Sequence, residues 1–107
     1  MSAQVAADLR AAADVLERDG WTQNTNLNEE TGCRCAMGAL AYVASNGETS
    51  HDGVLRDTPR DIRLRAATGP LVDLINNGIT MWNDTPGRTA AEVVAALRAA
   101  ADKADQS

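Results

Sequence analysis

The chain has 107 residues, fifteen acidic and ten basic side chains, and a formal net charge of −5. This is the length of one ordinary domain, so we predict a single helical domain over residues 1–107. The acidic balance disfavours nucleic acid, which proteins bind through many uncompensated Lys and Arg side chains. Large apolar residues are few (nine Leu, seven Val, three Ile and no Phe), so the core is thin and a homodimer stays open.

The N-terminal segment lacks the basic stretch and apolar run of a signal peptide. We find no run that approaches the roughly 20 apolar residues of a membrane span. Cys33 and Cys35 are too few to cross-link a secreted scaffold. We therefore expect a soluble cytoplasmic protein with reduced thiols and no membrane contact.

The first predicted helix covers about residues 2–18, with Leu9 and Leu16 on its apolar face. Gly20 ends it, because glycine tolerates the left-handed conformation of a helix C-cap. We expect Trp21, directly after this stop, to fold back over the end of the bundle.

Residues 22–34 are predicted as a long polar loop, in which a small hairpin stays open. A second helix then begins at Cys33 or Cys35 and ends near Ser45. Gly38 in its middle costs up to about 1 kcal/mol of helix propensity. We therefore expect a neighbouring helix to approach closely at Gly38.

Residues 48–57 are a second predicted polar loop. Thr58-Pro59 is typical of an N-cap followed by the first helical residue, with Asp61 favourable in the first turn. The third helix is predicted to carry Ile62 and Ala66 inward.

Gly69-Pro70 should break or kink this helix, since proline disfavours helix for the residue before it. A short fourth helix over residues 70–76 is then predicted to bury three apolar side chains, Leu71, Leu74 and Ile75.

Residues 79–82 could form one helical turn, and Pro86-Gly87 suits the central positions of a type II turn. Thr89 followed by Glu92 predicts a capping box that opens the last helix, which runs to about residue 103.

The hexamer Leu9–Asp14 recurs as Leu97–Asp102, which we interpret as a compositional coincidence and not a duplication. Both terminal helices nevertheless carry alanine-lined stripes, and we expect them to pack against each other. The predicted fold is therefore all-α: a compact bundle of four to five helices with two polar loops and its Ala-rich terminal helices packed together.

Cys33, Cys35, His51 and Asp52 could in principle offer four ligands to zinc. The second closely spaced pair of ligands that structural zinc sites use is missing, so we predict no metal and no cofactor. A thiol enzyme would need His51 as its base. We favour Cys35 as a small buried apolar residue and Cys33 as a loop residue, and predict no enzyme.

Arg56, Arg60 and Arg63 fall on one side of the third predicted helix. This stripe could contact phosphates, and a nucleic-acid-associated regulator is the alternative function. Asp57 and Asp61 lie beside it and partly neutralise it, so we favour a solvated helix face.

Residues 82–89 are the most distinctive stretch. In a structural interpretation Trp82 anchors the loop, Asn83 and Asp84 shape the turn, and Thr89 caps the last helix. In a functional interpretation the stretch belongs to a recognition patch, since Trp and Arg are typical interface anchors. The candidate partner-binding residues are Trp21, Trp82, Asn83, Asp84 and Arg88.

Three motifs carry a resemblance to a known family: Gly20-Trp21, Cys35-Ala36-Met37-Gly38-Ala39-Leu40, and Trp82-Asn83-Asp84-Thr85-Pro86-Gly87-Arg88-Thr89 followed by Glu92-Val93. With them the chain resembles a family of uncharacterised small proteins from actinobacteria and their phages. The resemblance implies such an origin and brings no established activity. We expect a non-catalytic interaction module that binds a host or phage protein.

Overall fold

The computed structural model describes residues 2–47 and 59–106. Within them the helices are α1 (Ser2–Asp19), α2 (Ala36–Ala44), α3 (Pro59–Ile75), α4 (Ile79–Asn83) and α5 (Ala90–Asp105), and there is no strand in this part of the chain. The predicted all-α class is confirmed. The second predicted loop and the Thr58 cap lie outside the described residues.

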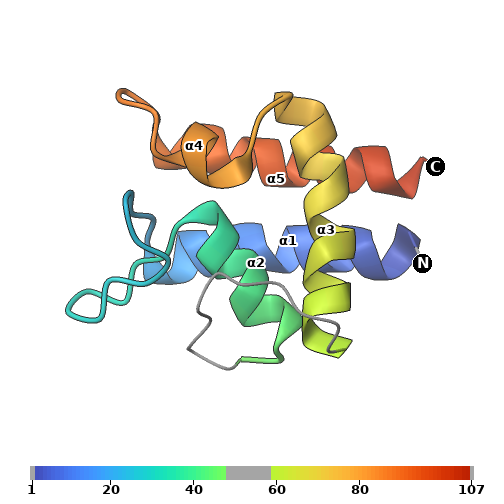
Figure 1. Cartoon of the computed structure of the whole chain (residues 1–107), viewed down its shortest axis with the longest axis horizontal. Helices are drawn as coiled ribbons and strands as arrows, with labels where there is room; N and C mark the ends of the chain where they lie inside the picture. Colours follow the sequence, from blue (N-terminus) through green and yellow to red (C-terminus); the bar gives the residue numbers. More distant parts are fainter. Residues whose placement is uncertain (1, 48–58, 107) are drawn as a thin grey trace.

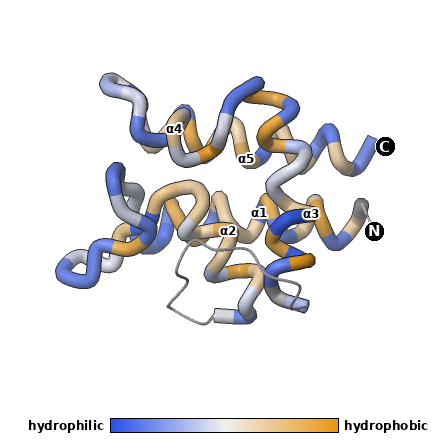
Figure 2. The backbone as a smooth tube through the Cα atoms, in the orientation of Figure 1, coloured by the Kyte–Doolittle hydropathy of each residue, from blue (hydrophilic) through white to orange (hydrophobic). Residues whose placement is uncertain are grey.

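The two terminal helices lie side by side and antiparallel, with α2 and α3 crossing them (Figure 1). They make the most extensive contact between elements, as predicted from their alanine-lined stripes. Leu9 and Leu97 are fully buried at this contact, together with small residues such as Ala13 and Ala101. Small side chains let the two helices approach closely. In Figure 2 the loop between α1 and α2 is mostly hydrophilic, whereas apolar residues recur along the helices.

The repeated hexamer has a reciprocal place in this helix pair. Arg10 of the first copy contacts Asp102 of the second at 2.9 Å, and Arg98 of the second contacts Asp14 of the first at 3.0 Å. The two copies are thus related by an approximate two-fold rotation, in which each arginine contacts the aspartate of the other copy. The repeat therefore has a structural consequence, whatever its origin.

A further acidic residue joins each of these pairs. Arg10 also contacts Asp105 at 2.6 Å, and Arg98 contacts Glu17. The hydrogen bond from Arg98 holds the pKa of Glu17 below its usual value. Because these side chains are exposed to water, each pair contributes little to stability, and salt screens it. Their geometry instead favours one register of the two helices.

The structure shows where α2 begins and which part of the chain lies close to Gly38. Cys35 is the N-cap, and the helix begins at Ala36. The close approach at Gly38 comes from the loop and not from a helix, since a Cβ built on Gly38 would lie 2.0 Å from the main-chain oxygen of Asn26. Only glycine allows the backbone of the loop to lie so close to α2.

The predicted break at Gly69-Pro70 is wrong, because α3 continues through Pro70 to Ile75. A proline ring displaces the carbonyl four residues earlier, which belongs to Ala66. Ala66 and Gly69 are both exposed, so the ring has room and the freed carbonyl can bond to water. The separate helix over residues 70–76 therefore does not exist.

The predicted inward face of α3 is also wrong. Ile62 is 58% exposed and Ala66 faces solvent, while Leu64, Ala67 and Leu71 point into the core. These three residues follow the spacing of one helix face across the whole of α3, and the continuous helix selects that face. Burial of Leu71 is confirmed, and Ile75 packs against the core while remaining partly exposed. The predicted burial of Leu74 is wrong, since it is 42% exposed.

In the C-terminal part of the chain, the structure agrees closely with the prediction from the sequence. The amide of Arg88 donates to the carbonyl of Thr85 at 3.1 Å, and Gly87 has a φ of 85°, as a type II turn requires. Thr89 and Glu92 form the predicted capping box at the start of α5.

Among the described residues, no helix is both long and apolar enough to span a membrane.

Candidate functional site

The loop that follows α1 and the segment that follows α4 meet at one end of the molecule, and Asn83 joins them. Asn83 is fully buried, and its Oδ1 accepts hydrogen bonds from Trp21 Nε1 at 2.6 Å and from the amide of Ala36 at 3.0 Å. Its Nδ2 donates to the carbonyl of Thr22 at 3.1 Å and to Asp84 Oδ1 at 3.0 Å. One side chain therefore links α4 to the loop and to the start of α2.

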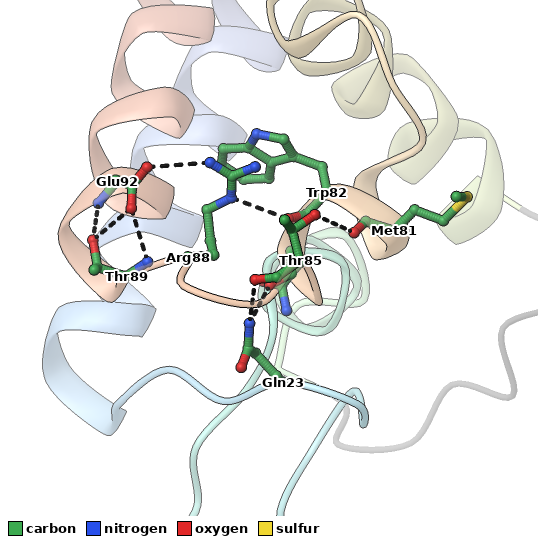
Figure 3. A network of polar contacts seen from close by, with 8 residues as sticks. Gln23, Met81, Trp82, Thr85, Arg88, Thr89 and Glu92 are labelled. Carbon is green, nitrogen blue, oxygen red and sulfur yellow. Dashed lines mark hydrogen bonds and ion pairs between the residues drawn. The ribbon is translucent and has the colours of Figure 1, made fainter.

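The polar loop adds further bonds to the same segment. Gln23 Nε2 donates to the main-chain oxygens of Asn83 and Thr85, each at 3.0 Å (Figure 3). The amide of Asn24 donates to Asp84 Oδ1 at 2.9 Å. Asp84 thus accepts from both sides of the junction. These bonds hold the first part of the loop against residues 83–85.

Within the loop, residues 27–34 form a narrow turn and not a regular hairpin. Arg34 makes isolated bridges with Trp21 and Leu27, and the amide of Asn28 donates to the carbonyl of Cys33 at 2.8 Å. The guanidinium of Arg34 lies 4.1 Å from the centre of the Tyr42 ring. The hairpin left open by the sequence is therefore reduced to isolated bridges.

Arg88 lies across the indole of Trp82, with its guanidinium carbon 4.4 Å from the ring centre (Figure 3). Its Nε donates to the carbonyl of Trp82 at 3.1 Å, and a terminal nitrogen donates to Glu92 at 3.1 Å. Hydrogen bonds from Thr89 and then from Arg88 lower the pKa of Glu92. These contacts fix the position of the indole relative to α5.

The outer side of α4 is open. Met81 is 73% exposed, the most among the large exposed apolar residues in the described part of the chain. Its side chain points away from the polar network in Figure 3. Trp82 is half-buried, and no described residue accepts a hydrogen bond from its indole N–H. We call Met81, Trp82 and Arg88 the α4 surface.

The structure brings all five predicted partner-binding residues together, but gives them different roles. Trp21, Asn83 and Asp84 hold the loop and α4 together, whereas Trp82 and Arg88 border solvent. Sequence reasoning missed the contribution of Gln23 and Asn24 from the loop. It also missed Met81, because a segment as short as residues 79–82 shows no periodicity that indicates which side chain is exposed.

The two cysteines differ in burial and in their contacts. Cys35 is 2% exposed, and its sulfur accepts from the amide of Gly38 at 3.3 Å and donates to Asn26 Oδ1 at 3.3 Å. Burial raises the pKa of the Cys35 thiol, which opposes formation of the nucleophilic thiolate. Cys33 is half-buried, and its sulfur lies beside Gly20. His51, the base of the hypothetical dyad, lies outside the described residues.

The arginine stripe is represented by Arg63 alone. Its guanidinium donates to both carboxylate oxygens of Asp8, at 2.7 and 2.8 Å, and to Asn46 Oδ1 at 2.9 Å. The bonds to Asp8 raise the pKa of Arg63 further. Three of the five guanidinium N–H groups are therefore used within the molecule, and the charge of Arg63 is paired with Asp8. Arg56 lies outside the described residues, as does the side chain of Arg60.

In residues 2–47 and 59–106, no three His, Cys, Asp or Glu side chains are grouped so that they could hold a metal ion.

Searches of the curated proteins and of the solved structures found no match. A family comparison matches residues 1–103, which is nearly the whole chain. This span includes the loop, the Asn83 junction and most of α5. The chain belongs to DUF6197, a family of unknown function.

Proposed function

We propose that the protein is a non-catalytic interaction module that binds another protein, of host or phage origin, through the α4 surface. The observation that carries the proposal is the 73% exposure of Met81 on α4. The residue that follows it, Trp82, has its indole ring stacked under the guanidinium of Arg88. Methionine side chains adapt to the shape of a partner, and Trp and Arg are common interface anchors. The three side chains together offer an apolar contact with polar groups at its edge.

The rigidity of the junction supports this proposal. Asn83 and Gln23 bind α4 to the loop, and Arg88, in the turn before α5, stacks on the Trp82 ring and donates to the Trp82 carbonyl. A surface fixed before binding loses less conformational entropy when the complex forms. The partner that fits is a protein with an apolar pocket for Met81 and a carbonyl or carboxylate acceptor for the indole N–H of Trp82, which donates to none of the described residues.

Origin and compartment belong to the same proposal. Abundant alanine and a strong preference for Arg over Lys, together with the three sequence motifs, support a source in actinobacteria or their phages. The two free cysteines support a reducing compartment, for which we propose the cytoplasm. The nucleic-acid alternative gains nothing from Arg63, which is bound to Asp8.

The experiment that tests the proposal is site-specific photo-crosslinking in cells that produce the protein. A photoreactive amino acid replaces Met81 in one variant and Ile62 in the matched control, since Ile62 is also exposed but lies on α3, away from the α4 surface. We expect a defined protein adduct from position 81 and none from position 62.

The captured protein is then purified, and its affinity is measured for the wild-type chain and two variants. Met81→Ala should weaken binding about tenfold, as loss of an interface anchor does, and Ile62→Ala should leave the affinity unchanged. Equal adducts from both positions, or no adduct from position 81, would refute the proposal.

A further inference from the structure

The chain contains two Asn-Gly sequences, Asn46-Gly47 and Asn77-Gly78. In such a pair the main-chain nitrogen of the glycine can attack the side-chain amide carbon of the asparagine. Glycine favours this reaction because it has no side chain to obstruct the approach. Whether the attack occurs in a folded protein depends on the freedom of that nitrogen, and here the two sites differ.

At the second site, the glycine nitrogen faces the asparagine side chain. The amide of Gly78 donates to Asn77 Oδ1 at 2.8 Å, which brings the nitrogen close to the Cγ atom that carries this oxygen. Both residues are exposed, and nothing lies within 4 Å of a Cβ built on Gly78. The nitrogen is therefore near its target and free of the surrounding fold.

At the first site, the same two groups are bound elsewhere. The amide of Gly47 donates to the carbonyl of Tyr42 at 2.8 Å, in the turn that ends α2. Asn46 Oδ1 accepts from Arg63 at 2.9 Å. Attack would require this turn to open and the bond to Arg63 to break.

We propose that Asn77 is a site of spontaneous covalent modification, at which the folded protein converts the asparagine to aspartate and isoaspartate. The Gly78 nitrogen loses its proton and forms a bond to Asn77 Cγ, the Cγ–Nδ2 bond breaks, and ammonia leaves with that proton. The product is a cyclic succinimide. Water then opens the ring at either carbonyl carbon, and no electron is transferred overall.

The two ring openings have different consequences for the chain. Opening at Cγ gives aspartate and keeps the main chain, whereas opening at the Asn77 main-chain carbonyl carbon gives isoaspartate and lengthens the main chain by a methylene. This link lies between α3 and α4, and the Gly78 carbonyl accepts the first helical bond of α4, from Trp82 at 3.0 Å. Isoaspartate therefore alters the connection that positions α4.

The test is incubation of the purified full-length chain in mildly alkaline buffer, followed by tryptic digestion and mass spectrometry. Cleavage after Arg34, Arg56, Arg65 and Arg88 puts Asn46 and Asn77 into separate peptides. The readout is the mass gain from loss of ammonia and addition of water, because isomerisation at Asp52-Gly53 changes no mass. The same chain in urea gives the reference rates of the two sites without the fold.

We expect Asn77 to react at least about tenfold faster than Asn46 in the folded chain, which is the factor for one hydrogen bond that must break at Asn46. In urea the ratio should approach unity. Gly78→Ala, which fits the φ of −64° and the open space there, should slow the reaction at Asn77 strongly without loss of the fold, because the alanine side chain hinders the attacking nitrogen. The proposal is overturned if the ratio of the rate at Asn77 to the rate at Asn46 is no larger in the folded chain than in urea. It is also overturned if Asn77 stays unmodified in the folded chain over a time in which Asn77 of the unfolded chain has been converted.

Discussion

Replacement of Asn83 by alanine tests the junction between the loop and α4. The variant loses four side-chain hydrogen bonds, and leaves Trp21 Nε1–H, the Ala36 amide and the Thr22 carbonyl without their partner. Each buried polar group left unpaired costs about 1–3 kcal/mol. Trp21 and Thr22 are only partly buried, so water can replace part of the loss, and we take the lower half of the range. The expected loss in the free energy of unfolding is about 3–6 kcal/mol, a large share of the 5–15 kcal/mol typical of a domain.

The assay is urea denaturation followed by far-UV circular dichroism, with Asn77→Ala as the matched control. Asn77 is exposed and bonds only to its neighbour, so its replacement should change stability by less than about 0.5 kcal/mol. Asn83→Asp adds a second comparison, because it keeps an acceptor for Trp21 but turns an oxygen toward the Thr22 carbonyl. A loss below about 1 kcal/mol in Asn83→Ala would refute the reasoning, since the network would then contribute no more than one ordinary hydrogen bond.

Three further predictions concern residues outside the junction. Gly38→Ala should destabilise the fold by about 3 kcal/mol or more in thermal and urea unfolding, because its Cβ meets the Asn26 oxygen. The control Gly78→Ala, with a φ of −64° and open space around it, should change stability by no more than about 1 kcal/mol, and equal effects would contradict the packing described. Thr89→Ala should cost about 1 kcal/mol through loss of the α5 cap, and a neutral result in the same assay would argue against the capping box. In native alkylation with iodoacetamide, monitored by mass spectrometry, Cys33 should react well before Cys35, whose thiol is buried and has a raised pKa; fast reaction of Cys35 would reopen the question of a reactive thiol.

Much of the fold was predictable because local signals agreed with one another. The capping box at Thr89, the Pro-Gly turn and the glycine stop after α1 each depend on a few adjacent residues. The pairing of the terminal helices was predictable from their alanine content, since small side chains favour close packing. The reciprocal arginine–aspartate contacts were not, because they depend on the register of two helices far apart in sequence.

The errors in α3 have a common cause. Pro70 is a strong local signal for a helix end, but its effect depends on whether the freed carbonyl can reach water. The exposure of Ala66 supplies that condition, and it follows from the three-dimensional position of the helix. The incorrect break then separated Leu64 and Ala67 from Leu71 and obscured the row that they form.

The residues of the candidate site could be predicted from the sequence, but the sequence does not show which of them hold the fold together and which lie at the surface. Two tryptophans beside polar loops look alike in sequence. The structure separates them, because Trp21 donates to the buried Asn83 while Trp82 stays at the surface under Arg88. A buried asparagine with three hydrogen-bond partners from distant segments has no local signature. Its role appears only when the loop folds onto α4.

Hydrogen exchange of the two indole N–H groups, followed by NMR, tests this separation most directly. The account predicts slow exchange for Trp21 Nε1–H, which is bonded to Asn83 at 2.6 Å, and fast exchange for Trp82 Nε1–H, for which no described residue supplies an acceptor. Tryptophan-to-phenylalanine replacement at each position assigns the two resonances. Fast exchange at Trp21, or protection of Trp82 equal to that of Trp21, would contradict the view that one tryptophan secures the fold while the other faces a partner.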